Sequence, residues 1–309
     1  MSIDLQELPD ELFEPLEQDP ASLEMTGFSN FSFWGSTLRT FFKSKLSIAL
    51  ISVIGILVAF SFIYPIFGTD PNTVYLDTTK WNQKASLAHP FGTDGLGRDI
   101  FSRTWHGTRN SLMLAMAIAL VEIGVGTIVG AFWGYMRNLD PIMLELYNII
   151  TNIPSTVYLV LMSYIMRPSF VSLVIVLASR GWISEAKFMR NRVLSIRESE
   201  YNIASQCLGA PIWRIVLKNI IPYIISLVIM ETALTVPSSI GSEVFLGFVG
   251  LGLPIDTISL GNLVNQGRSN FLLYPQQLLL PAGVLCVITV SFYIAGNRFA
   301  DASDPKNHV

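Results

Sequence analysis

The sequence predicts an all-α membrane protein with six transmembrane helices and with both termini in the cytoplasm. The 309-residue chain is 51% hydrophobic and only 14% charged, whereas soluble domains usually carry about a quarter charged residues. Its apolar residues also gather into runs close to the roughly 20 residues that an α-helix needs to cross a bilayer. Because lipid satisfies no backbone polar group, we expect runs of this length to be helices.

The N-terminal 33 residues differ in composition from the rest of the chain. Residues 1–30 contain eight acidic side chains and three prolines. Such a segment cannot bury enough apolar surface to fold alone and is typical of a solvated tail. We therefore predict an acidic, mobile cytoplasmic tail over residues 1–33 and a transmembrane domain over residues 34–309.

The six crossings follow one another along this domain. Basic residues precede the first apolar run, which places its start in the cytoplasm. Asp140 is expected to be the N-cap of the third crossing, and Pro154 to bend that crossing. Arg180 lies within the fourth. The predicted crossings cover residues 46–67, 111–136, 142–166, 170–183, 220–244 and 277–295.

The connections between the crossings are unequal in length and charge. Residues 69–110 form a long polar loop that lies outside the cell despite five basic residues, because long loops follow the positive-inside rule less strictly. Within it, we expect Asp94 to cap a short helix and Asp99 to pair with Arg103 at i, i+4 spacing. Residues 186–219 form the most basic stretch and are therefore predicted to be cytoplasmic.

One cytoplasmic segment, "SEYNIASQCLGAPIWRIVLKNIIPY" at 199–223, is too polar to cross a bilayer. One face of its first predicted helix carries Tyr201, Ala204, Ser205 and Leu208. Gly209 can adopt the left-handed conformation that ends a helix. Pro211 fits the first position of a second short helix, and Pro222 marks the start of the fifth crossing. Two such helices could dock into a groove of a partner protein, or alternatively rest on lipid.

Three acidic residues lie in or near the apolar runs: Glu122, Glu231 and Glu243. Charge inside a membrane is costly and usually faces the bundle interior or a water-filled path. These residues are therefore candidates for lining a translocation path, with local pairing that stabilises packing as the alternative. For Arg180, near Trp182, snorkelling to the inner interface is the simpler interpretation.

The sequence indicates no catalytic or metal site. Its three histidines and two cysteines lack metal-ligand spacing, and the motifs of zinc proteases and serine hydrolases are missing. No Gly-Lys-Ser/Thr loop is present to hold a phosphate, and no basic patch points to nucleic acid. We expect no catalytic residue, no metal and no cofactor bound by this chain.

Four motifs occur in order along the chain, and the second of them has two parts, "IASQCLG" and "IIP". "HPFGTDGLGRDIFSRTWHGTRNSL" begins at His89, and "IASQCLG" and "IIP" begin at Ile203 and Ile220. "SEVFLGFVGLGLP" and "NRFADASDP" begin at Ser242 and Asn297. From about residue 34 to the end, this pattern resembles the C-type permeases of dipeptide and oligopeptide ATP-binding-cassette (ABC) importers. That family has Glu where this chain has Ile203, and Ala where it has Ser205.

The resemblance implies a type I ABC importer permease in the bacterial plasma membrane. Its implied partners are a second homologous permease, two ATPase subunits that hold ATP and Mg, an extracytoplasmic peptide-binding protein and membrane lipid. Nickel or another solute is the alternative substrate, and a gradient-driven secondary transporter is the alternative class. The residues implied to couple to the ATPases are Tyr201, Ile203, Ala204, Ser205, Leu208, Gly209 and Pro222.

Overall fold

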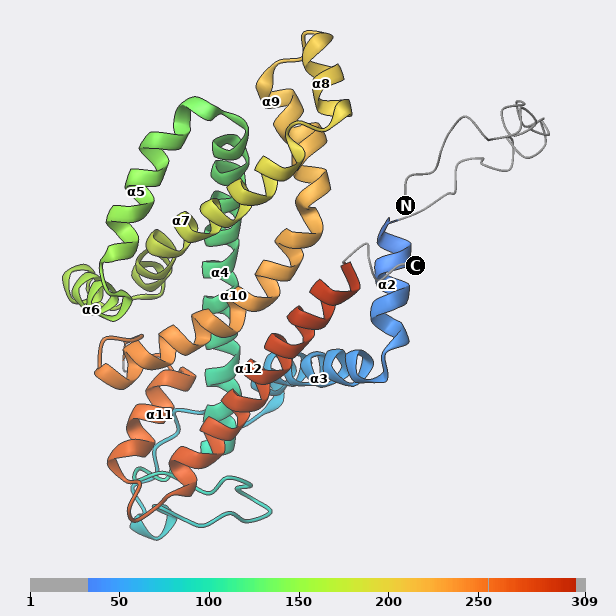
Figure 1. Cartoon of the computed structure of the whole chain (residues 1–309). Coiled ribbons are helices and arrows are strands. Elements are labelled where there is room, and N and C mark those ends of the chain that lie inside the picture. The colour runs from blue at the N-terminus through green and yellow to red at the C-terminus, as the bar shows by residue number, and fades with distance from the viewer. Residues whose placement is uncertain (1–32, 255, 304–309) are drawn as a thin grey trace, which may run out of the picture.

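The computed structural model describes residues 33–254 and 256–303, so residues 1–32 of the predicted tail lie outside the described part. Within the described part the chain is helical and contains no strand. Four helices are long and apolar enough to cross a membrane: α3 (Lys45–Phe67), α4 (Ile100–Tyr135), a continuous helix over Ile212–Val249, and α12 (Gln276–Ser303). Figure 1 shows them in an elongated bundle with irregular segments at its lower end.

The centre of this bundle is the pair formed by α4 and α7 (Phe170–Ile196). Glycines recur every fourth residue on one face of α4, and a Cβ on any of them would clash with α7. The glycines are Gly126, Gly130 and Gly134, and the α7 residues nearest to them include Glu185, Ala186 and Val193. Small residues let helix backbones approach closely where water supplies no driving force. Contacts advance together along both helices, so α4 and α7 run parallel.

The third predicted crossing is a bent pair of helices. α5 (Asp140–Asn152) and α6 (Ser155–Met166) meet at an angle of 84°, and together they would make a fifth span. Pro154 is the N-cap of α6. The expected bend at this proline is therefore confirmed, and it is sharp enough to divide the crossing into two helices.

Asp140 does not cap α5, so that prediction is wrong. Leu139 occupies the N-cap position. The Asp140 carboxylate instead accepts a hydrogen bond from Trp133 Nε1 at 2.8 Å and binds Arg190 Nη2 of α7 at 2.6 Å. The aspartate thus ties the start of α5 to both central helices, which a sequence pattern of local spacing does not show.

Several other boundaries differ from the predicted ones. α4 begins at Ile100, so part of the loop predicted over 69–110 is helical. α7 begins at Phe170 as predicted but continues to Ile196, well past residue 183. The short helix α11 (Leu260–Ser269) lies between the fifth and sixth predicted crossings, where the sequence predicts no helix.

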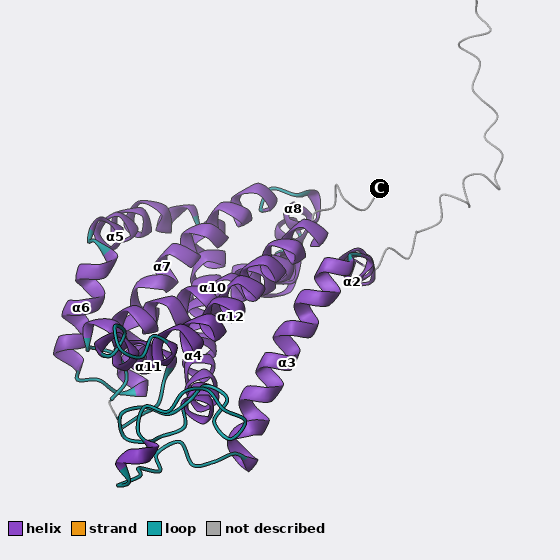
Figure 2. Ribbon diagram, turned by 90° about the horizontal axis from the view of Figure 1, so that it is seen from below, coloured by secondary structure: helices purple, strands orange, loops and turns teal. Residues whose placement is uncertain are grey.

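The first two helices of the described part lie at one side of the bundle. α2 (Phe33–Lys43) precedes α3, and the Phe41 ring contacts the Phe299 ring of α12 with 5.9 Å between centroids. Figure 2 shows α3 along one side of the other helices. Most large apolar side chains of α3 are exposed, as expected of a span whose surface faces lipid or another membrane protein.

Candidate functional site

A helical hairpin stands at the upper end of the bundle in Figure 1. It consists of α8 (Glu200–Cys207), a turn at Gly209, and α9 (Ile212–Ile215). Gly209 has φ of +75°, and the next amide, of Ala210, donates to the Ser205 carbonyl at 3.0 Å. This is the left-handed helix ending that favours glycine, and the prediction for Gly209 is confirmed. Pro211 is the N-cap of α9 rather than its first residue.

Two asparagines fix the base of the hairpin. The fully buried Asn202 donates through Nδ2 to the Ile196 carbonyl at the end of α7, at 3.0 Å. Asn219 Nδ2 lies 3.3 Å from Asn202 Oδ1 and 3.2 Å from Ser205 Oγ. The sequence pattern did not single out these asparagines, because their role depends on three segments meeting. They join the hairpin rigidly to α7 and to the helix that follows.

The second arm of the hairpin is continuous with a membrane-spanning helix. α9 passes through a π-helical turn, η5 (Val216–Ile220), into α10 (Ile221–Val249) without a break. The prediction of a separate second helix is therefore wrong. A π turn absorbs one extra residue without ending a helix, and Pro222 falls at the start of α10, where a proline is tolerated. The second arm of the hairpin and α10 are thus one continuous helical segment, so a displacement of the hairpin also displaces α10.

The outer face of the hairpin is apolar and exposed. Leu208 is 88% exposed and Trp213 57%, and three further apolar side chains of the hairpin are about half exposed. They are Tyr201, Ile203 and Ile212. A concentration of exposed apolar groups on a polar segment marks an interaction surface. Most predicted coupling residues are thus exposed in the hairpin, whereas Ser205 is only partly exposed and Pro222 lies in the first turn of α10.

The opposite end of the bundle is covered by a cap, which comprises residues 69–99 and α11. Its central ion pair joins Asp94 Oδ2 to Arg103 Nη1 at 2.6 Å, and Arg103 is only 3% exposed. Arg98 Nε binds the same Asp94 oxygen at 2.7 Å. Asp99, not Asp94, caps α4, by accepting from the amides of Phe101 and Ser102. Both predictions for this loop are therefore wrong, because the two aspartates have exchanged roles.

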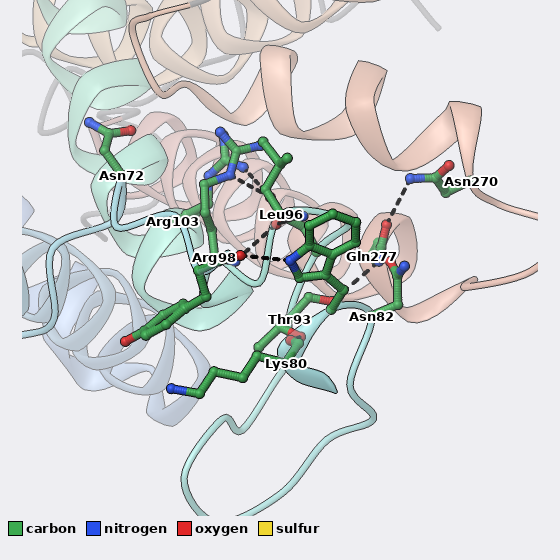
Figure 3. A network of polar contacts seen from close by, with 12 residues as sticks. Asn72, Lys80, Asn82, Thr93, Leu96, Arg98, Arg103, Asn270 and Gln277 are labelled. Atoms are coloured by element: carbon green, nitrogen blue, oxygen red, sulfur yellow. Dashed lines mark hydrogen bonds and ion pairs between the residues drawn. The ribbon is translucent and has the colours of Figure 1, made fainter. Parts of the chain in front are cut away.

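A second polar network ties the cap to α12. Gln277 Nε2 donates to Asn82 Oδ1 at 2.8 Å and lies 3.3 Å from the Thr93 carbonyl. Asn270 Nδ2, just after α11, donates to Gln277 Oε1 at 3.2 Å. Figure 3 shows these side chains converging from two regions that are far apart in the sequence, residues 82–93 and residues 270–277. The cap is therefore an ordered part of the fold rather than a loose loop.

The three acidic residues predicted for a translocation path occupy different surroundings. Glu243 is 1% exposed, accepts a hydrogen bond from Ser111 Oγ at 3.0 Å, and packs against Gly261 of α11. Glu122 lies against Gly181 of α7, about three helical turns along α4 from Ser111. Glu231 is partly buried in α10. Glu243 thus links three helices, while Glu122 borders a cavity.

A fourth acidic residue, Glu185, was not predicted. It is 7% exposed and packs against Gly126 of α4. It lies about one helical turn along α7 from Gly181, against which Glu122 packs. The predicted fourth crossing ends at residue 183, so Glu185 lies outside it, and only the length of α7 places this residue inside the bundle.

Several apolar spans, an ordered cap and an exposed hairpin define a multi-pass membrane protein built to work with partners. The sequence profile described as "Binding-protein-dependent transport system inner membrane component" matches residues 123–309. The chain belongs to this family and is a multi-pass protein of the bacterial plasma membrane. Permease subunits of ABC importers generally work with ATPase and substrate-binding partners. The relatives of this chain are transport permeases, not enzymes.

Curated relatives are similar over nearly the whole chain. The oligopeptide transport system permease protein AmiD of Streptococcus pneumoniae is 33% identical, covering 96% of this chain and 98% of the relative. The oligopeptide permease OppC of Bacillus subtilis is 32% identical, covering 98% and 99%. The dipeptide permease DppC of Bacillus subtilis is 32% identical, covering 97% and 94%. The predicted resemblance is confirmed.

A solved structure shares the fold. The MetNI methionine ABC transporter, in inward-facing conformations, contains a chain that matches 64% of this one with a TM-score of 0.53. The match covers 94% of that chain at 19% identity. At this identity the similarity concerns the fold alone, and it agrees with the predicted ABC importer permease architecture.

Proposed function

We propose that this chain is a permease subunit of an ATP-driven importer of dipeptides or oligopeptides and forms half of its translocation path. The single observation that carries the proposal is the exposed apolar hairpin that continues into α10. The full-length similarity to permeases named for peptide transport supports the substrate class. In this arrangement α7 is a sixth crossing, the hairpin and both termini are cytoplasmic, and the cap lies outside.

The proposed partners follow from the two ends. The hairpin, with Leu208 and Trp213 as apolar anchors, docks into a groove of an ATPase subunit. Two such ATPases bind and hydrolyse ATP with Mg, so this chain needs no cofactor of its own. A second, homologous permease completes the path through the membrane, and a peptide-binding protein delivers substrate on the side of the cap.

The mechanism is alternating access, in which ATP binding selects one of two orientations of the helices. Closure of the ATPase pair displaces the hairpin. The displacement reaches α10 through the continuous helix over Ile212–Val249 and reaches α7 through the buried Asn202 contact. Both helices border the polar cavity near Glu122. Their movement therefore changes the side of the membrane to which that cavity is open.

Uptake of a radiolabelled tripeptide tests this proposal. A strain that carries Gly209→Trp in place of the native gene is expected to lose at least about tenfold in uptake, because a bulky residue at φ of +75° distorts the docking turn. Gly55→Trp is the matched control, since Gly55 lies exposed in α3 with open space around it. Normal uptake by the Gly209 variant, at an equal amount of membrane protein, would contradict the coupling role.

A further inference from the structure

A polar cavity of about 240 Å³ lies inside the bundle between α4, α6, α7 and α10. Its polar lining consists of one carboxylate, one guanidinium and six hydroxyl groups. The charged groups belong to Glu122 and Arg180. The hydroxyl groups belong to Ser155, Ser184, Thr235, Ser238, Ser239 and Ser242. Such a concentration of polar groups among membrane-spanning helices calls for a functional reason, since each is costly there.

The two charged groups of the cavity do not neutralise each other. Arg180 donates through Nη1 to the Ile153 carbonyl at 2.6 Å and lies 6.0 Å from the Tyr158 ring. No hydrogen bond or ion pair joins Glu122 to any residue in 33–254 or 256–303. Glu122 is only partly buried and rests against Gly181. Its carboxylate therefore faces the cavity with its acceptor sites free.

The hydroxyl groups are also largely unused. A serine or threonine within a helix commonly donates to the carbonyl four residues earlier, and Ser242 does so, to Ser238, at 3.1 Å. No hydrogen bond connects the other five hydroxyls to the described part of the chain. Ser239 is the clearest case, because it is 5% exposed and still lines the cavity. Buried polar groups normally have a partner, so the cavity is equipped for a polar ligand.

The charge around the cavity selects the kind of ligand. Glu185, on the helix that carries Gly181, is 7% exposed, and its Oε1 atom has no hydrogen-bond partner. This residue lies about one helical turn along α7 from Gly181, against which Glu122 packs. Acidic groups therefore outnumber the single guanidinium of Arg180, whose Nη1 already binds a carbonyl. A cation is favoured next to Glu122, with neutral hydrogen-bonding groups beside it.

We propose that this cavity is a subsite for the α-ammonium group of the transported peptide, with Glu122 as its counter-ion. The hydroxyls of Thr235, Ser238 and Ser239 on α10 bind the first peptide groups of the same molecule. This inference rests on the proposed function and adds the place in the chain that holds the free amino end of the substrate. Since α7 and α10 both line the subsite, the movement that reorients the translocation path also changes the contacts with the amino end of the peptide.

Photo-cross-linking in the purified, intact transporter complex tests the subsite. The probe is an alanine tripeptide with a diazirine group on its central side chain, used below saturation with either a free or an acetylated amino end. In the wild type, the free-amine probe is expected to label α4, α7 and α10 around the cavity. Glu122→Gln should lower this labelling about tenfold, since a hydrogen bond to a charged group is lost.

The acetylated probe and a matched variant provide the controls. Acetylation removes the cation, so labelling of the wild type should fall to the level of the Glu122→Gln complex. Glu145→Gln removes an exposed acid of α5 and should leave labelling unchanged. Ser239→Val, which fills the cavity without altering charge, should reduce labelling by both probes. Recovery of each variant with the other subunits confirms that it has folded.

The outcomes separate the subsite from the proposed function. Equal labelling by the two probes in the wild type, undiminished labelling in Glu122→Gln, or labelling only outside the cavity would overturn the subsite. Tripeptide uptake by cells measures the proposed function independently. If deletion of the gene leaves peptide uptake unchanged, the proposed function fails; if deletion abolishes uptake while the probes show no dependence on the amino end, only the subsite fails.

Discussion

The two ends of the molecule are held together in opposite ways. In the cap, the nearly buried Arg103 and its neighbour Arg98 share the Asp94 carboxylate, and Gln277 joins three segments. In the hairpin, Asn202 and Asn219 fix the base, but the outer face exposes Leu208 and Trp213. The cap pairs its main charged groups within the chain, whereas the hairpin leaves its apolar groups uncovered.

This difference predicts which property is lost when each end is mutated. A change in the cap removes contacts within the chain and should appear as a loss of stability. A change on the outer face of the hairpin removes contacts only with a partner, and should appear as a loss of association at unchanged stability. The predictions below test this division, beginning with the largest expected effect.

Asp94→Ala should have the largest effect. It leaves Arg103 charged, buried and unpaired, which typically costs about 3–5 kcal/mol. The expected result is a marked fall in the thermal stability of the purified protein and in its amount in the membrane. Asp70→Ala, which changes an exposed aspartate at the start of the cap, should have little effect. Equal stability of the two variants would show that the ion pair does not hold the cap.

Gln277→Leu should have the next largest effect. It removes the hydrogen bonds that Gln277 makes with Asn82 and Asn270 and leaves the partly buried Asn82 Oδ1 without this donor, at a cost of about 1–3 kcal/mol. Thermal unfolding followed by tryptophan fluorescence measures the change. Gln266→Leu, in α11, serves as the matched control because Gln266 is less buried. Unchanged thermal stability of the Gln277→Leu variant would show that the ion pair of Asp94, and not the Gln277 network, holds the cap.

Leu208→Asp should weaken ATPase association about tenfold while changing stability by less than about 0.5 kcal/mol, because the side chain is exposed in the isolated chain. Co-purification of the ATPase with the tagged chain measures association. Leu272→Asp, at a position 95% exposed next to the cap, should leave ATPase recovery unchanged. Equal recovery with both variants would remove the hairpin face from the ATPase interface.

Gly209→Ala should have the smallest effect. Placing a Cβ at φ of +75° costs about 1–2 kcal/mol locally. We expect amide hydrogen exchange across the hairpin turn to accelerate at least about fivefold, with little change elsewhere. Gly241→Ala, within α10 and surrounded by open space, should not accelerate exchange there. Unchanged exchange at the turn in the Gly209 variant would mean that the turn is less constrained than its geometry implies.

The sequence predicts the spans better than the contacts between them. Apolar runs place α3, α10 and α12 well, and Pro154 bends the third crossing, because hydropathy and proline geometry act locally. The roles of Asp94 and Asp99 are exchanged, since both have suitable local spacing and only the position of Arg103 decides between them. Asn202 was likewise missed because its partners come from other segments.

The candidate sites show the same division. The turn at Gly209 follows from local spacing, so the sequence located it, whereas the exposed Trp213 becomes apparent only in the structure. The cavity near Glu122 depends on four helices meeting, and Glu185 belongs to it only because α7 continues beyond its apolar run. The acidic residues could be selected as costly in a membrane, but the free hydroxyls around Glu122 become apparent only in three dimensions.

The most direct test of the account is the identity of the proteins that purify with the tagged, wild-type chain from its native membrane in a gentle detergent, determined by mass spectrometry. The account predicts ATPase subunits in a ratio of two to each copy of this chain, together with one second, homologous multi-span permease. An intact chain that purifies alone under several mild detergents would contradict it and would favour a transporter that works without ATP.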